Sequence, residues 1–552
     1  MNDQIQIQLG EKLYKVKKDV KVIDFLNALK YDKSIIAVKV NGNIKNLNYI
    51  LSKDVSIDLV KYNSAMGNKI YVNGLKFLFI IATKEILGAN TEIIFEHSID
   101  KGIYTTINSN QGLNGETIKQ IATKMYEYIN NSEKIDSINV SKKDLLEYYN
   151  TTNQKDKLKS LETNTSEFVK INKCLKYYAY FYGTLPINMS YVSKFKISFL
   201  GKNNVVLRYP IVNKDYLIPD YVHHKKIIDI FDEYNGWLNK LDVYNVGDLN
   251  SIISHDKIKE FILINEYMQF ERLTNIGNNI VGNIDKSKLI LIAGPSSSGK
   301  TTSANKLCMY LKSRGIKTHL ISTDDYFKDR DETPKDENGE YNFDDLDALD
   351  LSLFNDHLKK LINGEEVEIP IYNFFKGIKE YNGRKIKLDN NSILVVEGIH
   401  ALNEKLTSEI PREEKTKIYL APFTPLNIDN YNYISTRDIR LLRRIVRDNR
   451  TRGRGVIDTL KGWEKVKNGE EKYIFCFQDE ADFVFNTAII YETGVIKTYV
   501  EPLLYSVPMD SEYYQDAKRL IEFLRLFFPI PAEYVPADSI LREFIGNSCF
   551  YD

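Results

Sequence analysis

Residues 288–302 carry the most informative chemistry of this 552-residue chain, because an apolar strand sequence leads there into a glycine-rich loop. Gly294 is followed after four residues by Gly299, and Lys300 and Thr301 come next. In a P-loop with this spacing, backbone N–H groups and a helix N-terminus converge on phosphate oxygens, the lysine reaches the β- and γ-phosphates, and the hydroxyl binds Mg²⁺. The sequence therefore predicts a nucleotide phosphate site. The residues expected to line it are Gly294, Ser296, Ser297, Ser298, Gly299, Lys300, Thr301 and Thr302.

Two carboxylates follow apolar strand sequences downstream of this loop. The strand expected over 318–322 leads to Asp324, and the strand expected over 392–399 reaches Glu397. At the carboxyl ends of parallel strands, where ligands bind in open α/β sheets, Asp324 could accept a hydroxyl proton or bind Mg²⁺. A helix N-cap is the alternative role for Asp324. Glu397 has the position of a Walker B acid that orients Mg²⁺, since a carboxylate at the end of an apolar strand is costly without positive charge nearby.

An arginine-rich segment covers residues 437–454. At helical spacing, three of its arginines share one face and three aliphatic residues share another. The arginines are Arg440, Arg444 and Arg447, and the aliphatic residues are Ile439, Leu442 and Val446. Guanidinium groups stabilise the charge that spreads over a transferred γ-phosphate, so we expect this helix to form a mobile lid over ATP. An RNA-binding helix is the competing interpretation.

Two further segments offer groups for a second substrate. The acidic stretch 341–350 is mostly expected to be a solvated loop with a helix cap, but Asp344 is a candidate binding residue. Tyr372 and Phe374 lie beside the rigid Pro370, and they could stack on a flat base or simply pack in the core. The candidates for acceptor binding thus lie between the two strands that deliver Asp324 and Glu397.

The elements that must position these residues form an α/β domain with a parallel sheet, expected over 285–508. Three regions precede it and one follows. They are a compact β-rich unit over 1–62, a mixed α+β region over 63–250, a helical connector over 251–284, and a C-terminal helix and tail over 509–552.

Local patterns predict individual elements before the parallel sheet. In the first unit, strands are expected over 4–9, 12–16, 35–40 and 56–60, and a helix over 22–29. A second helix is expected over 77–87. In the connector, the apolar positions at near-helical spacing are Ile262, Leu263, Tyr267 and Phe270.

Composition narrows the class of protein. The formal net charge is zero, so no overall field draws the chain to nucleic acid or to a membrane. The four cysteines are scattered without a CxxC pair, which suits a reducing compartment and gives no sign of structural zinc. The N-terminus lacks the pattern of a signal peptide, and no apolar stretch approaches the length of a membrane span. A cytoplasmic protein is expected.

Six linked segments between about 288 and 506 resemble the uridine kinase/phosphoribulokinase family of P-loop kinases. They read GPSSSGKTT, STDDYF, YNFDDLDALD, PIYNF, VVEGIHAL and RDIRLLRRIVRD. The resemblance implies a kinase that uses ATP and Mg²⁺ to phosphorylate the 5′-hydroxyl of a uridine- or cytidine-like nucleoside. One departure concerns the base, because Gly377 stands where the family's uridine/cytidine kinases have a histidine that contacts the pyrimidine.

The same resemblance implies a role for each matching position. It makes Asp324, Lys300, Arg440 and Arg443 catalytic, with Asp324 as the base. It assigns metal binding to Thr301, Glu397 and Asp324, and nucleotide contacts to Arg447 and Arg452 in addition to the P-loop. It assigns acceptor binding to Asp344, Tyr372, Phe374 and Arg440.

The front of the chain resembles parts of threonyl-tRNA synthetases. The β-β-α-β-β order of residues 1–62 is similar to the ubiquitin-like β-grasp TGS domain, and residues 95–104 resemble a strand-turn of the synthetase editing domain. That family carries an HxxxH pair on the preceding helix, where this chain has Phe77 and Ile81. Two imidazoles at this spacing could bind metal or activate water, whereas Phe and Ile cannot. We therefore expect an editing-like fold without hydrolytic activity.

Two rival functions stay open at this point. One is a kinase of another hydroxylated metabolite, with the same phosphate site and a different pocket. The other is a nucleotide-gated RNA-binding or regulatory protein that binds tRNA through its synthetase-like front. A homo-oligomer is also open, since the helix expected over 513–528 could support either a subunit interface or intramolecular packing.

Overall fold

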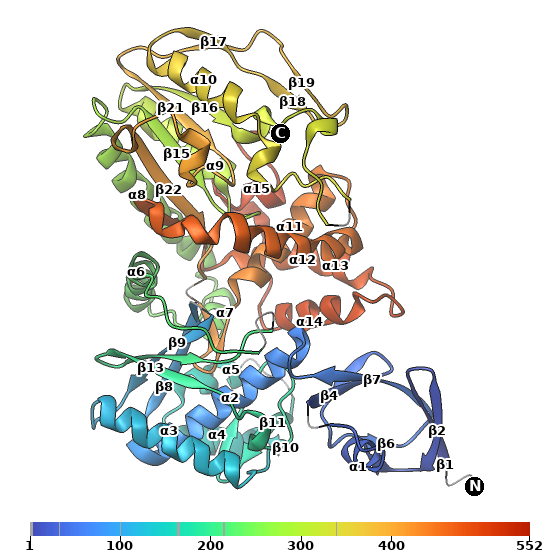
Figure 1. Cartoon of the computed structure of the whole chain (residues 1–552). Coiled ribbons are helices and arrows are strands. Elements are labelled where there is room, and N and C mark those ends of the chain that lie inside the picture. Colours follow the sequence, from blue (N-terminus) through green and yellow to red (C-terminus); the bar gives the residue numbers. More distant parts are fainter. Residues whose placement is uncertain are drawn as a thin grey trace. The chain divides into compact units, whose positions relative to one another are not determined.

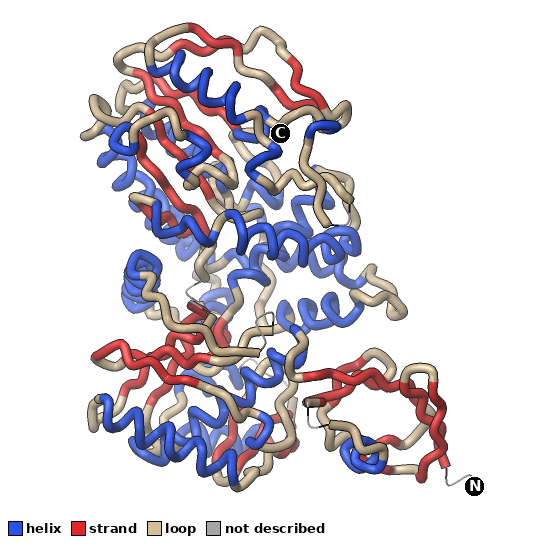
Figure 2. The backbone as a smooth tube through the Cα atoms, viewed as in Figure 1, coloured by secondary structure: helices blue, strands red, loops and turns tan. Residues whose placement is uncertain are grey.

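The computed structural model describes residues 4–551, apart from 33, 100, 163–165, 213–215, 338 and 425. The chain divides into two compact units. Unit 1 comprises residues 1–224, 238–251 and 426–435, and unit 2 comprises residues 225–237, 252–425 and 436–552. Figure 1 labels their elements, and Figure 2 distinguishes helices from strands. No helix in the described part of the chain is both long and apolar enough to cross a membrane.

Unit 1 begins with a five-stranded sheet of order β2-β1-β7-β4-β5, in which β1 and β7 run parallel. The predicted strands and helix of this region are confirmed, with small changes at their ends. Their bounds are β1 (Gln4–Leu9), β2 (Lys12–Lys17), α1 (Val22–Ala28), β4 (Ile35–Val40), β5 (Asn43–Lys45) and β7 (Val55–Lys61), with a short pair β3 (Val20–Lys21) and β6 (Ile50–Leu51). The identity of this sheet as a TGS-like domain stays a prediction.

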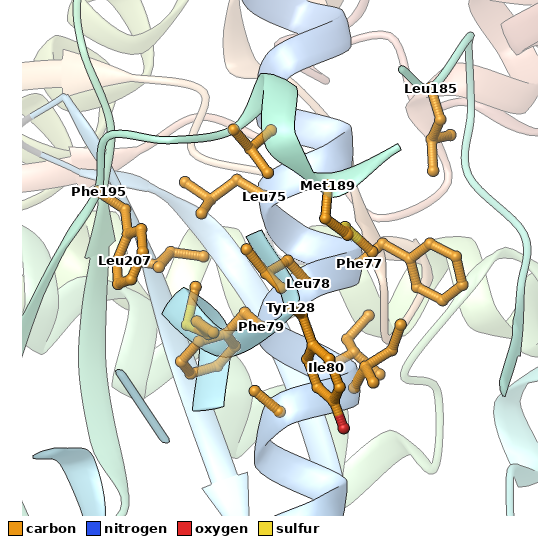
Figure 3. Close-up of a cluster of buried hydrophobic side chains, with 14 of the residues drawn as sticks. Leu75, Phe77, Leu78, Phe79, Ile80, Tyr128, Leu185, Met189, Phe195 and Leu207 are labelled. Atoms are coloured by element: carbon orange, nitrogen blue, oxygen red, sulfur yellow. The ribbon is translucent and has the colours of Figure 1, made fainter. Parts of the chain in front are cut away.

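The rest of unit 1 is built around helix α2 (Ala65–Leu87), which contains the predicted helix over 77–87 and starts earlier because the Ser64 side chain caps the N–H of Gly67. Phe77 and Ile81 are both buried in its core. Figure 3 shows Phe77 among the side chains packed around α2, so the two positions of the absent HxxxH pair are filled by core residues. The assignment of the region as editing-like stays a prediction.

Two further sheets and three helices complete this region. The sheets have the orders β13-β14-β9-β8 and β10-β11-β12, and all of their pairings are antiparallel. The bounds are β8 (Glu92–Ile99), β9 (Gly102–Asn108), α3 (Gly115–Asn130), β10 (Asp136–Ser141), α4 (Lys142–Thr151), α5 (Lys155–Glu162), β11 (Phe168–Cys174), β12 (Tyr177–Ala179), β13 (Lys196–Gly201) and β14 (Asn204–Arg208).

A short hairpin of unit 1 comes from far along the chain. Strands β23 (Asn427–Asp429) and β24 (Asn432–Tyr433) lie between two elements of unit 2 in sequence, yet they pack in unit 1. The backbone N–H of Phe95 donates to the carbonyl of Asn430 (2.9 Å), and the Asn427 side chain donates to the carbonyl of Phe95 (3.1 Å). The sequence pattern does not predict this excursion of the chain, in which residues 426–435 leave unit 2 and pack in unit 1.

Unit 2 contains the predicted parallel sheet, in the order β16-β21-β15-β22-β25. Its register pairs both Ile292 and Ser322 with Glu397, so the carboxyl ends of three neighbouring strands meet at one edge. The strands are β15 (Leu289–Ala293), β16 (Lys317–Ser322), β21 (Ser392–Glu397), β22 (Lys415–Ala421) and β25 (Phe483–Asn486). Short hairpins pair β17 (Glu366–Glu368) with β20 (Lys385–Lys387) and β18 (Ile371–Asn373) with β19 (Ile378–Glu380).

The helices of unit 2 include α9 (Lys300–Ser313), α10 (Leu351–Ile362), α11 (Thr436–Thr451), α12 (Val456–Tyr473), α13 (Glu492–Tyr505), α14 (Tyr514–Leu524) and α15 (Arg542–Ile545). Before the sheet come α6 (Lys225–Leu241), whose last residues belong to unit 1, α7 (Val246–Ser254), which lies mostly in unit 1, and α8 (Ile258–Val281) of unit 2. The connector is helical as predicted, but three of its four named apolar residues, Leu263, Tyr267 and Phe270, are exposed. The buried stripe of α8 runs instead through Ile258, Ile262, Gln269, Leu273 and Ile280.

Candidate active site

The P-loop joins the central strand β15 to helix α9, as the spacing predicts. Gly299 has φ +83°, and a side chain on Gly294 would meet the carbonyl oxygen of Leu420 at 2.2 Å, so both positions require glycine. Ser297 adopts φ +59°, an unusual conformation for a non-glycine residue. The hydroxyls of Ser297 and Ser298 are buried and have no hydrogen-bond partner among the described residues. A bound phosphate would supply one.

Lys300, Thr301 and Glu397 lie together at the head of this loop. Lys300 Nζ donates to the loop's own carbonyls, at 2.9 Å from Gly294 and 3.3 Å from Pro295. Thr301 Oγ1 donates to Glu397 Oε1 (3.3 Å). Burial lowers the pKa of Lys300 and raises the pKa of Glu397 to about 7, while the attraction between the two opposes both shifts. Burial therefore favours the protonated form of the Glu397 carboxyl in the absence of ligand.

Asp324 lies just beyond the end of β16, in a short 3₁₀ turn over Thr323–Tyr326. The N-cap of that turn is Ser322, whose hydroxyl accepts from the Asp324 N–H (3.3 Å), so the alternative reading of Asp324 as a cap is wrong. The residue is exposed to solvent, yet the protein packed around its carboxyl group raises its pKa, against the attraction of Lys300 and Arg452. The Asp324 carboxylate does not cap the turn, and the positive charge of Lys300 acts on it.

The lid helix α11 packs as predicted through Ile439, Leu442 and Val446. Arg440 and Arg443 are also buried, each against a carboxylate that the sequence analysis did not identify. Arg440 pairs with Glu470, and its Nε donates to the carbonyl of Ser296 (2.9 Å).

Arg443 is held in the same way on the other side of the loop. It pairs with Glu492, and its guanidinium donates to the carbonyls of Ser297 (3.4 Å) and Thr487 (2.8 Å). Arg440 and Arg443 therefore brace the backbone of the P-loop in this state.

Three further arginines of the segment lie around Asp448, which is fully buried. Its carboxylate lies 2.8 Å from Arg447, 3.2 Å from Arg444 and 3.7 Å from Arg452. Arg444 also donates to the hydroxyl of Ser296 (2.6 Å). Burial, together with the charges of Arg447 and Arg444, lowers the pKa of Arg452 to about 10. Three guanidiniums share one carboxylate, so the cluster presents an excess of positive charge beside the loop.

The groups expected to bind an acceptor lie in two sets. Burial raises the pKa of Asp344, and Arg444 is the arginine whose charge acts most on it. A Cβ on Gly469, the neighbour of Glu470, would lie 3.1 Å from Asp344 Oδ2, which places this carboxylate beside the helix that braces the P-loop.

The second set is a cluster of aromatic rings. Tyr372 lies 5.0 Å from Phe374 and 5.5 Å from Phe327, measured between ring centroids. Tyr372 is buried, and its hydroxyl has no hydrogen-bond partner among the described residues, while Phe374 is 58% exposed. The core-packing and stacking interpretations thus apply to different residues, because the Tyr372 ring is packed inside and the Phe374 ring is available to a ligand.

The sequence of this region is similar to the sequences of known proteins. The model of the phosphoribulokinase/uridine kinase family matches residues 289–493. A uridine kinase of Staphylococcus haemolyticus (strain JCSC1435) is 32% identical over 179 residues, which cover 32% of this chain and 76% of that protein. The chain belongs to the phosphoribulokinase/uridine kinase family. A uridine kinase of Clostridium botulinum (strain 657 / Type Ba4) is 34% identical over 182 residues, which cover 32% of this chain and 77% of that protein.

A solved structure also aligns with the kinase region. A possible uridine kinase from Bacillus stearothermophilus is 18% identical and is covered over 98% of its length, and 39% of this chain, at a TM-score of 0.24. The fold assignment therefore depends on the observed parallel sheet and on the sequence match.

The residues of this kinase domain fit ATP and Mg²⁺. The unpartnered hydroxyls of Ser297 and Ser298 and the backbone N–H groups of the loop suit phosphate oxygens, and Lys300 can turn from its own loop carbonyls to a phosphate. The Thr301 hydroxyl and the Glu397 carboxylate form an all-oxygen pair. Mg²⁺ commonly takes one or two protein oxygens and completes its shell with phosphates and water.

Proposed function

We propose that unit 2 transfers the γ-phosphate of ATP to the 5′-hydroxyl of a uridine- or cytidine-like nucleoside. The observation that carries this proposal is the meeting of three functions at one sheet edge. The P-loop follows β15, Asp324 follows β16 and Glu397 ends β21, and the register brings these three strand ends side by side. Family membership supports phosphoryl transfer in general.

Each group has a distinct task in this mechanism. The P-loop N–H groups and Lys300 hold the β- and γ-phosphates, while Thr301 and Glu397 would hold Mg²⁺, which would supply charge neutralisation at the phosphates. Asp324 orients the acceptor hydroxyl and accepts its proton. Because phosphoryl transfer has a loose transition state, positioning and charge neutralisation contribute more to the rate than proton removal.

The lid helix supplies the remaining charge. Among the described residues, Arg444, Arg447 and Arg452 all form ion pairs with the single carboxylate of Asp448, so their positive charge is available to a triphosphate. Arg440 and Arg443 contribute indirectly by holding the carbonyls of Ser296 and Ser297, which keeps the loop in its phosphate-binding shape.

A nucleoside acceptor is supported by two features beside Asp324. The exposed ring of Phe374 can stack on a base, and the Asp344 carboxylate can accept hydrogen bonds from ribose hydroxyls. The relatives quoted above carry the name uridine kinase. Pyrimidine selection needs a different reader in this chain, since Gly377 has no side chain to contact the base.

A panel of nucleosides and sugars in an ATP-consumption assay tests the proposal directly. We expect turnover with a pyrimidine nucleoside, a 5′-monophosphate as the product, and a loss of most turnover in Asp324→Asn. Asp325→Asn is the matched control, because Asp325 pairs with Arg384 at 3.4 Å and takes no part in the mechanism. Wild-type rates in Asp324→Asn, or no nucleoside product, would contradict the proposal.

A kinase of another hydroxylated metabolite is the second candidate, and the glycine at 377 is the observation that favours it. The phosphate site would be unchanged, and only the acceptor pocket would differ. Turnover with a sugar or polyol from the same panel, without turnover of nucleosides, would decide for this candidate.

A further inference from the structure

The C-terminal tail, residues 530–551, forms a wall of the P-loop that lies beyond the 289–493 match to the family. Leu541 and Phe544 are buried, and the guanidinium of Arg542 donates to several tail carbonyls, including those of Ala532 (2.9 Å) and Val535 (2.5 Å). The tail is therefore an ordered part of unit 2 with its own internal bracing.

Two further contacts hold this tail against helix α9 and the end of the P-loop. Lys306 Nζ lies 2.9 Å from Asp538 Oδ2. The Ile540 side chain packs so closely on Gly299 that a Cβ there would lie 2.6 Å from Ile540 Cγ2. These contacts would keep the tail in place if no other were present.

A third contact places a carboxylate inside the phosphate cradle. Glu543 Oε2 accepts from the backbone N–H of Thr302 (3.2 Å) and from its hydroxyl (2.9 Å), and the Tyr551 hydroxyl also contacts Thr302 Oγ1. Thr302 follows the P-loop lysine and threonine directly, in the first turn of α9, where the N–H groups of a P-loop hold the α- and β-phosphates. A carboxylate at this position occupies a donor that a nucleotide needs.

The charge of Glu543 reaches the rest of the site. It raises the pKa of both Lys300 and Glu397, the two groups that would face the phosphates and the metal. Beside a triphosphate, the same charge is repulsive. A purely structural contact with Thr302 would not need a charged group, since a neutral amide could accept the same two hydrogen bonds.

The tail is also tied to the lid helix. The ring of Phe544 lies 5.0 Å from the Arg443 guanidinium, and the Phe544 carbonyl accepts from Arg450 (2.9 Å). Gly546 follows at φ +95°, a conformation that favours glycine. A movement of Glu543 away from Thr302 would therefore act on two lid arginines.

We propose that Glu543 is a built-in competitor for nucleotide phosphate. Its carboxylate fills a phosphate position of the P-loop in the nucleotide-free protein, and binding of a nucleoside triphosphate requires the tail to withdraw it. The position of the tail thereby sets the affinity for nucleotide. This inference depends on the proposed function only in that the P-loop binds nucleotide, and it holds for any acceptor.

Equilibrium binding of Mg·ATP to the full chain, measured by calorimetry without an acceptor, tests it. Glu543→Gln keeps the size of the side chain and an oxygen acceptor but removes the charge. We expect its dissociation constant to be about tenfold lower than that of the wild type, equivalent to about 1.4 kcal/mol. Glu533→Gln, at an exposed position of the same tail, is the matched control and should bind as the wild type does. An unchanged or weaker affinity in Glu543→Gln would overturn the proposal.

Hydrogen exchange of residues 540–551 gives a second, independent readout. In the wild type, Mg·ATP should reduce protection of this segment, because Glu543 leaves Thr302. Increased protection would show that the tail closes on the nucleotide, and it would refute the competitor role. Both measurements are made without turnover, so an absence of nucleoside kinase activity would overturn the proposed function and leave this result standing.

Discussion

One buried charge cluster in unit 1 is fully partnered, whereas the charges around the P-loop of unit 2 are only partly partnered. In unit 1, Lys76 and Lys157 are buried with Asp156 and Asp429, and each side chain is partnered by its neighbours or by backbone groups of the β23–β24 hairpin. In unit 2, three arginines share Asp448, and two P-loop hydroxyls have no partner among the described residues. A charge cluster that is complete stabilises the fold, whereas one that is incomplete is prepared for a ligand.

The largest effect should come from opening the complete cluster of unit 1. Lys157 Nζ lies 2.9 Å from Asp156 and 3.5 Å from the centroid of the Tyr431 ring. Lys157→Met would leave buried carboxylates without their cation, so we expect unit 1 to lose about 3–5 kcal/mol of its free energy of unfolding. Urea denaturation measures this loss, with the exposed Lys155→Met as the control. Equal stability of the two variants would show that the cluster is not structural.

The incomplete cluster should respond in activity and not in stability. Lys300→Ala should lower kcat/KM by about 10²- to 10³-fold, because the variant loses a cation that stabilises the transferred phosphoryl group. Its urea midpoint should stay near that of the wild type, since the hydrogen bonds of Lys300 to described residues are to carbonyls of its own loop. Lys312→Ala, on the exposed side of α9, is the control. Near wild-type turnover in Lys300→Ala would show that the incompletely partnered charges of unit 2 do not serve phosphoryl transfer, and the contrast with unit 1 would fail.

The pH dependence of nucleotide binding sharpens the comparison further. The pKa of Glu397 is raised to about 7 without ligand, whereas Mg²⁺ binding requires the carboxylate. The affinity for Mg·ATP should therefore fall by up to about tenfold for each unit below pH 7 and level off above it. Titration calorimetry from pH 6 to 8 measures this, and Glu397→Gln should flatten the profile. A persistent slope in that variant would assign the titration to another group.

The same raised pKa has the opposite effect on the stability of the unliganded protein. The folded state favours the protonated carboxyl, so the contribution of Glu397 to stability is fully present below its ordinary pKa and is lost as the pH rises through about 7. When Mg·ATP occupies the site, this contribution to stability should instead increase as the pH rises.

The smallest effect should come from the rim of the arginine cluster. The Arg452 side chain is about half exposed, so water and salt screen its charge. Arg452→Ala should raise the KM for ATP by only about two- to fivefold, and the difference should shrink in 0.5 M salt. If Arg452→Ala lowered kcat/KM as strongly as Lys300→Ala, Arg452 would belong to the centre of the phosphate site and not to its rim.

The parts of the site that could be predicted are those in which neighbouring residues in sequence act together. The P-loop, the two acid-bearing strands and the apolar side of α11 are local patterns, and each was confirmed in position. Glu470, Glu492 and Glu543 could not be predicted, because each meets its partner across tens to hundreds of residues and no spacing rule connects them. Arg440 and Arg443 were expected to face a ligand, and they are buried because those distant carboxylates neutralise them.

The exposed face of α8 illustrates a different limit. Leu263, Tyr267 and Phe270 are apolar at near-helical spacing, yet the buried stripe runs along another side of the helix through residues that include the polar Gln269. Gln269 is buried because its side-chain amide donates to the carbonyl of Ala488 (2.6 Å). The apolar spacing predicted the helix, but it does not identify which side of the helix is buried.

The excursion of residues 426–435 has a practical consequence for anyone who would dissect this protein. A fragment that stops at residue 250 would lack Asp429 and Tyr431, and it would leave Lys157 and Lys76 facing a missing hairpin. A fragment that starts at residue 285 would carry the hairpin with nothing to pack it against. We therefore expect unit 1 to fold only when residues 426–435 are present in the same polypeptide.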